Sequence, residues 1–135
     1  MSQSAIYVVN NSAQNVAVNG VISLGTIIRK FGQNLNLSGN AIQINGAGYY
    51  DLDASITLAP TAAGNVTVTA YKDNVIIPGA IATGSTTAAN NPINLSISSL
   101  VREFCPCCEG LGNITFVLTG TAANVSNIAV VVEKV

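Results

Sequence analysis

The stretch that decides the fold runs from residue 48 to residue 59 and reads GYYDLDASITLA. Its side chains alternate, with Tyr50, Leu52 and Ile56 on one side and Asp51 and Asp53 on the other. Because successive side chains of an extended chain point to opposite faces, this period of two indicates a β-strand with one buried face. No segment shows the i, i+3, i+4 apolar pattern of an amphipathic helix.

The same alternation recurs along the chain, which predicts an all-β protein. It is found in residues 35–37, 42–44, 66–71, 93–98 and 114–119. Residues 125–132 differ, since they end with apolar side chains on both faces, as in a strand that is covered on both sides.

Turn-forming residues separate these segments. Asn19-Gly20, Asn45-Gly46 and Asp73-Asn74 have the composition of tight hairpin turns, and Pro78-Gly79 has that of a corner. Many short strands joined by such turns predict an antiparallel β-sandwich or jelly roll. The length of 135 residues predicts one domain, 1–135.

The composition excludes several classes of function. Charged residues make up 8% of the chain and the net charge is −1, so no basic surface is available to bind nucleic acid. Histidine is absent, which excludes catalytic triads and His-based zinc sites. We therefore predict that the protein is not an enzyme and carries no cofactor. So little charge is also unfavourable for the solubility of a monomer.

The N-terminal residues 1–10 lack the basic region of a secretory signal, and no apolar run approaches the ~20 residues that span a bilayer. We expect no signal peptide, no membrane insertion and synthesis in the cytoplasm. If the protein is found outside the cell, we expect cell lysis or particle assembly to have brought it there.

Three motifs occur in an order that resembles a known family. Gly48 and Tyr50 match a strand that opens Gly-x-Tyr, Ile77-Pro78-Gly79 matches an apolar-Pro-Gly corner, and residues 128–132 match a last, central apolar strand. The pattern is similar to the tumour-necrosis-factor-like jelly roll of complement-type globular heads and of the C-terminal domains of collagen-like exosporium glycoproteins. Leu52 departs from it, since the complement branch prefers an aromatic there. The residues before Gly48 contain no Gly-x-y repeat, so we expect a free-standing head without a collagen stalk.

The resemblance implies a compact homotrimer with a structural or adhesive role. We expect a trimeric building block or head of a spore-surface or phage or prophage virion assembly, whose main partner is itself and whose trimers can assemble further. The alternative is a carbohydrate- or receptor-binding adhesion module with a glycan or cell-surface ligand. The expected trimer core comprises Tyr7, Tyr50, Phe116, Ile128, Val130 and Val132. For each aromatic residue, a place in the core of the single chain is the alternative.

Three cysteines, Cys105, Cys107 and Cys108, lie within four residues. One interpretation is a soft-metal or redox site, since thiolates bind Zn²⁺ and Cu(I). A second is an interchain disulfide, because three cysteines cannot all pair within one chain. A third is a reduced surface loop. The C-x-C-C spacing does not match the paired C-x₂-C motifs of zinc ribbons, so the sequence favours a disulfide or a reduced loop over a metal site.

Asp51 and Asp53 share the polar face of one predicted strand. Two carboxylates on one face could bind Ca²⁺ or act as acid and base, but the sequence indicates neither the further ligands nor the closed cleft that these functions need. We expect ion pairs with Arg29, Lys30 or Arg102 instead, either within the chain or across a subunit boundary. Adjacent opposite charges such as Lys72-Asp73 are typical of solvated strand ends.

Overall fold

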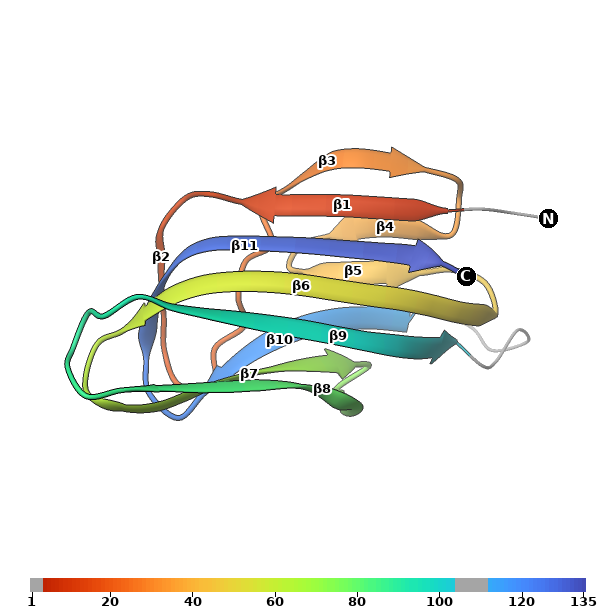
Figure 1. Ribbon diagram of the computed structural model, residues 1–135. Coiled ribbons are helices and arrows are strands. Elements are labelled where there is room, and N and C mark those ends of the chain that lie inside the picture. The colour runs from red at the N-terminus through yellow and green to blue at the C-terminus, as the bar shows by residue number, and fades with distance from the viewer. Residues whose placement is uncertain (1–3, 104–111) are drawn as a thin grey trace.

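The computed structural model describes residues 4–103 and 112–135, and in these residues it contains two antiparallel β-sheets that pack face to face (Figure 1). Sheet A has the order β3 (Thr26–Phe31), β1 (Ala5–Asn10), β11 (Ala123–Lys134), β6 (Gly48–Pro60) and β9 (Ile93–Glu103), and β2 (Gln14–Val16) also pairs with β11. Sheet B has the order β4 (Leu35–Ser38), β5 (Ala41–Ile44), β10 (Gly112–Thr119), β7 (Gly64–Lys72) and β8 (Val75–Thr86). The prediction of an all-β antiparallel sandwich is confirmed.

Strands from the two ends of the sequence meet in the middle of sheet A. The first strand, β1, pairs with the last strand, β11, over its whole length, and β11 then pairs with β6. Figure 1 shows β1 in red beside β11 in blue, with β6 in yellow on the other side of β11. The segment 48–59 that shows the clearest alternation is therefore an inner strand of sheet A, one place from its β9 edge.

The core lies between the sheets and is built from the inward side of each alternating strand. Tyr50, Leu52 and Ile56 of β6 are fully buried, and Phe116 of β10 is fully buried on the facing sheet. Their outward neighbours along the strands are more exposed, as the period of two requires. Burial of such side chains stabilises the fold by about 1.5–3 kcal/mol each.

The structure has the predicted hairpin turn at Asp73-Asn74, between β7 and β8. Asp73 and Asn74 have φ angles of 52° and 68°, which are the two positive values that a two-residue type I′ turn needs. The prediction of a corner at Pro78-Gly79 is wrong, because both residues lie inside β8. Gly79, with a φ of 81°, belongs to a bulge in this edge strand, where a proline costs no ladder hydrogen bond.

The sequence showed no strand at residues 26–31, where the structure has β3. All six residues of β3 are exposed, so the strand has no buried side to impose an alternating pattern. Within residues 4–103 and 112–135, no helix is long and apolar enough to cross a membrane.

Candidate functional site

The outer face of sheet A, which points away from the core, is apolar at its centre. Val131 of β11 lies directly opposite Tyr7 of β1, and these side chains are 37% and 36% exposed. Ala129 and Val9 form the next outward pair along the same two strands. Phe31, at the end of β3, is 58% exposed. We call Tyr7, Val9, Phe31, Ala129 and Val131 the open face.

A shallow hollow of about 170 Å³ lies on the open face, and Tyr7, Arg29, Phe31 and Val131 are among the residues that line it. The sequence of β11 predicted a strand covered on both sides, but in the single chain only one side is covered. Val130 and Val132 point into the core and are fully buried, whereas Val131 between them points to solvent. A contiguous apolar patch at the centre of a sheet is a candidate contact surface for another molecule.

Three carboxylates lie beside the open face. Asp51 of β6 is directly opposite Glu133 of β11, and Asp53 is opposite Val131. Like charges placed directly opposite each other destabilise a strand pair. Among the residues that the structure describes, none of these three carboxylates makes an ion pair.

Of the predicted partners of Asp51 and Asp53, Arg29 lies on the opposite side of the open face. Arg29, Tyr7, Val131 and Asp53 follow one another across four strands, so about 14 Å, three strand spacings, separates the first from the last. An arginine cannot span that distance. The prediction of an ion pair between Arg29 and Asp53 within one chain is therefore wrong. An ion pair between them across a subunit boundary stays a prediction.

The other two cations have different neighbours. Lys30 follows Arg29 on β3 and points to the opposite side of the strand, where its Nζ donates to Asn36 Oδ1 at 3.4 Å. Arg102 lies over the ring of Tyr49, with 5.9 Å between the guanidinium carbon and the ring centroid. This distance allows a cation–π interaction at the β9 edge of sheet A.

Five of the six residues expected in a trimer core belong instead to the core of the single chain. Tyr50, Phe116, Ile128, Val130 and Val132 are at most 1% exposed, so none of them can contact another subunit in this fold. For Tyr50 and Phe116 the alternative of a place in the core of the single chain is the one observed. Tyr7, at 36% exposure, is the remaining residue and lies on the open face.

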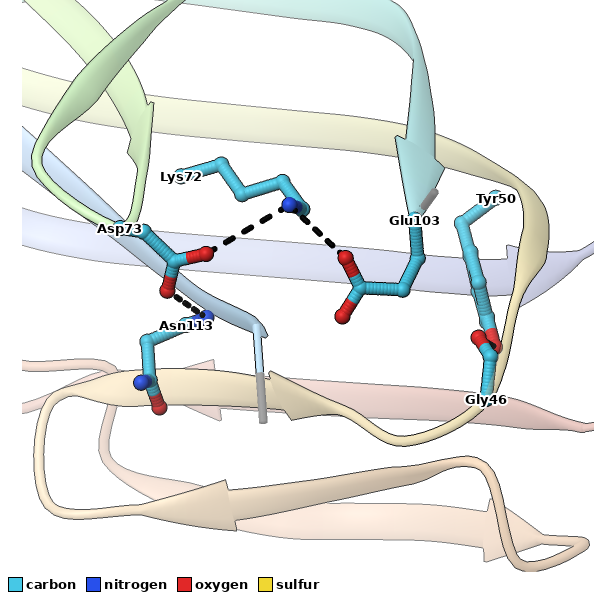
Figure 2. A network of polar contacts seen from close by, with 6 residues as sticks. All are labelled: Gly46, Tyr50, Lys72, Asp73, Glu103 and Asn113. Carbon is cyan, nitrogen blue, oxygen red and sulfur yellow. Dashed lines mark hydrogen bonds and ion pairs between the residues drawn. The ribbon is translucent and has the colours of Figure 1, made fainter. Parts of the chain in front are cut away.

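Lys72 joins the two sheets at one end of the sandwich (Figure 2). Its Nζ lies 2.9 Å from Glu103 Oε1, at the end of β9, and 3.5 Å from Asp73 Oδ2 in the next turn. Asp73 Oδ1 also accepts a hydrogen bond from the Asn113 backbone N–H at 3.0 Å. The Lys72 cluster, formed by Lys72, Asp73 and Glu103, therefore holds the end of β9 and the start of β10 to the turn between β7 and β8.

The Lys72 cluster changes the proton affinity of its members. Burial lowers the pKa of Lys72, but the hydrogen bond and negative charge of Glu103, together with Asp73, outweigh it, so the pKa lies above its ordinary value. Burial, and then the charge of Glu103, raises the pKa of Tyr50, whose hydroxyl donates to the Gly46 carbonyl at 2.8 Å. Both shifts favour the protonated forms at neutral pH, which suits a structural role.

Cys105, Cys107 and Cys108 lie outside the described residues, so the metal, disulfide and reduced-loop interpretations stay predictions. In the part of the chain that the structure describes, no group of three or more Cys, Asp or Glu side chains is placed to hold a metal ion.

Sequence reasoning did not find the ion pair between Lys72 and Glu103. The two residues lie on different sheets and are far apart in the sequence, so no local pattern relates them. Of the open face it named only Tyr7, although the apolar side chains on both sides of residues 128–132 were a signal for the rest.

No protein-family model and no curated protein matches the chain. Solved structures match it over nearly its whole length. Eiger TNF from S. frugiperda has a TM-score of 0.69 at 9% identity, over 98% of this chain and 91% of that one. PRD1 vertex protein P5 has a TM-score of 0.66 at 17% identity, over 98% and 96% of the two chains. The globular domain of zebrafish complement 1qA protein has a TM-score of 0.65 at 6% identity, also over 98% and 96%.

These likenesses extend over nearly the whole chain and show its fold, which is the tumour-necrosis-factor-like jelly roll. The predicted fold class and the resemblance to complement-type heads are therefore confirmed at the level of the fold. At such low identities, likeness of fold does not carry a function from one protein to another.

Proposed function

We propose that the protein is a non-enzymatic structural component in which the open face joins three copies of the chain into a compact homotrimer. The observation that carries this proposal is the exposed apolar centre of sheet A, where Tyr7 and Val131 lie side by side on adjacent strands. An apolar patch of this kind gains free energy when a second surface removes it from water. The threefold form is what the resemblance to tumour-necrosis-factor-like heads implies.

The charges around the open face support contact between copies. Arg29 lies on the β3 side of the face, and Asp51, Asp53 and Glu133 lie toward its β6 side. A head-to-tail contact can bring the cationic side of one copy to the acidic side of the next, and three such contacts close a ring. This arrangement offers the carboxylates the guanidinium of Arg29, which lies too far from them within one chain.

We propose further that the trimer is a building block or head of an assembly that is displayed on a virion or a spore surface. The likeness to a protein named as a vertex protein supports the virion, and the resemblance to exosporium glycoprotein domains supports the spore surface. The absence of histidine and the ion-paired Lys72 cluster agree with a role that needs no catalysis.

Light scattering coupled to size exclusion tests the trimer. The purified chain should have three times its 13.8 kDa mass at micromolar concentration. Tyr7→Glu should give monomers, whereas Tyr71→Glu, a matched change on the outer face of sheet B, should leave the trimer intact. A monomeric wild-type protein, or equal effects of the two variants, would contradict the proposal.

Immunogold electron microscopy tests the display. Antibodies raised against the purified chain should label intact virions or spores from the source culture. Label confined to the cell interior, with bare particles, would argue against a surface role without affecting the result on the trimer.

A further inference from the structure

A second hollow, of about 290 Å³, lies where the connection from β3 to β4 meets β5. Five of its eight lining residues carry side-chain amides, a sixth is Lys30, and no carboxylate lines it. The amide residues are Gln33, Asn34, Asn36, Gln43 and Asn45. The volume is just below the roughly 300–1,000 Å³ range of ligand pockets. We call this hollow the amide pocket.

The wall of the amide pocket is held in place by Asn34. Its Oδ1 accepts a hydrogen bond from Ser4 Oγ at 2.7 Å, and its Nδ2 donates to the Asn45 carbonyl at 2.6 Å. The Asn45 backbone N–H in turn donates to the Asn34 carbonyl at 2.7 Å. These bonds tie the connection between β3 and β4 to the end of β5, so the pocket does not depend on a ligand for its shape.

Other polar groups of the pocket are available to a ligand. The side chains of Gln33, Gln43 and Asn45 make no hydrogen bond with any residue that the structure describes. Each amide offers both donors and an acceptor, which is what the hydroxyls of a sugar require in return. Asn36 and Gln43 lie directly opposite each other on β4 and β5, so their amides face outward as a pair.

Lys30 gives the pocket a positive charge that nothing in it neutralises. Its Nζ donates to Asn36 Oδ1 at 3.4 Å, a long hydrogen bond, and it makes no ion pair within the described residues. With no carboxylate in the lining, the pocket lacks the ligands that a divalent cation needs, and the lysine favours an anion.

We propose that the amide pocket binds a saccharide that carries an acid group. The amides of Gln33, Gln43 and Asn45 hydrogen-bond the hydroxyls, and Lys30 pairs with the carboxylate or sulfate of the sugar. No aromatic side chain lines the pocket, so stacking does not contribute and a single sugar binds weakly. This inference does not depend on self-association, because the pocket and the open face share no residue.

Titrations of the ¹⁵N-labelled full chain, followed by NMR, test the proposal. The probes are glucuronic acid and glucose 6-sulfate as acidic sugars, glucose as the neutral sugar, and sodium sulfate alone. Both acidic sugars should give saturable shifts confined to residues of the amide pocket, with glucose at least about tenfold weaker, since a charge-assisted hydrogen bond is roughly twice as strong as a neutral one. If only one acidic sugar binds, that result assigns the acid group as carboxylate or sulfate.

Variants separate the two parts of the pocket. Lys30→Gln should weaken the acidic sugar by about tenfold and leave the affinity for glucose unchanged. Gln43→Leu should weaken both sugars, and Gln43→Glu, which keeps the size of the side chain, should weaken the acidic sugar most. Asn40→Ala, in the turn between β4 and β5 and outside the pocket, is the control and should change nothing. An unchanged thermal transition confirms that each variant is folded.

Three outcomes would overturn the proposal. The first is the absence of saturable shifts with both acidic sugars. The second is binding of sulfate alone as tightly as of the acidic sugars, which would show a simple anion site. The third is equal binding of glucose and glucuronic acid, which would leave Lys30 without a role.

Discussion

The two outer faces of the sandwich have the same alternating pattern but different chemistry. At the centre of sheet B, the outward residues of β10 and β7 are mostly hydroxyl-bearing, with Thr115 opposite Tyr71 and Thr119 opposite Thr67. At the centre of sheet A they are apolar, with Tyr7 opposite Val131 and Val9 opposite Ala129. Both faces lie over the same core, so the stability of the single chain does not explain the difference.

The outer face of sheet B carries hydroxyls that pair across adjacent strands. The hydroxyls of Thr67 and Thr83 are 3.0 Å apart on adjacent strands, so this face is suited to remain in water. The outer face of sheet A leaves apolar side chains in water and places Asp51 opposite Glu133. A polar outer face can therefore remain in water in the single chain, whereas an apolar one with opposed like charges calls for a second surface.

The largest effect should come from placing a charge at the centre of the open face. Val131→Asp should leave the chain folded but give monomers, with a loss of association of about 3 kcal/mol or more, because a trimer would bury the new carboxylate in an apolar contact directly beside Asp53. Sedimentation velocity measures the change. Thr115→Asp, on a central strand of sheet B, is the control, and a trimer that survives Val131→Asp would remove the distinction between the faces.

A smaller effect should follow from a change between the sheets, which should alter neither outer face. Lys72→Met leaves Glu103, whose side chain is 15% exposed, without its cation, and should lower the free energy of unfolding by about 1–2 kcal/mol while the trimer persists. Urea unfolding followed by circular dichroism measures this loss.

The pH dependence of the free energy of unfolding tests whether the effect of Lys72→Met comes from the charge of Lys72. The pKa of Lys72 is raised in the folded chain, so its stabilising effect is complete below its ordinary pKa of 10.5 and is lost as the pH rises through the folded value. The difference between wild type and variant should therefore be constant from neutral pH to about pH 10 and shrink above it. A difference that disappears in mild acid alone would contradict this assignment.

Tyr50→Phe should have an effect of about 1 kcal/mol, because it removes one hydrogen bond to the Gly46 carbonyl from the core side of sheet A. The raised pKa of Tyr50 means that the unfolded chain ionises first, so wild-type stability falls as the pH rises above its ordinary pKa of 10.0. The difference in the free energy of unfolding between wild type and Tyr50→Phe should therefore shrink above that pH. Thermal unfolding at several pH values tests it, with Tyr71→Phe on the outer face of sheet B as the control.

The smallest effect should come from Asp51→Asn on the outer face of sheet A. Removing the like-charge opposition to Glu133 should stabilise the isolated chain by about 0.5 kcal/mol and weaken association at low salt, since the face then offers less negative charge to Arg29 of another copy. Unfolding of the Val131→Asp monomer, with and without Asp51→Asn, measures the stabilisation of the isolated chain. A change that destabilises this monomer would show that Asp51 has a favourable partner within the chain.

Most strands could be predicted from the sequence because alternation is a local property. Residues 48–59 and 66–71 lie in β6 and β7, and Asp73-Asn74 forms the predicted hairpin turn. The edge strand β3 could not be predicted, since exposure of all its residues removes the constraint that creates alternation. The amide pocket could not be predicted either, because it needs Lys30 of β3, Asn36 of β4 and Gln43 of β5 to come together.

The sequence by itself determined which residues share a side of each strand, because the period of two follows from the geometry of an extended backbone. It could not determine which side of β11 becomes the core, since Val130, Val131 and Val132 are all apolar. Tertiary structure decided this, because sheet B packs against only one side of sheet A and buries Val130 and Val132 while Val131 stays exposed. The open face, the Lys72 cluster and the amide pocket all arise from such packing between segments distant in sequence.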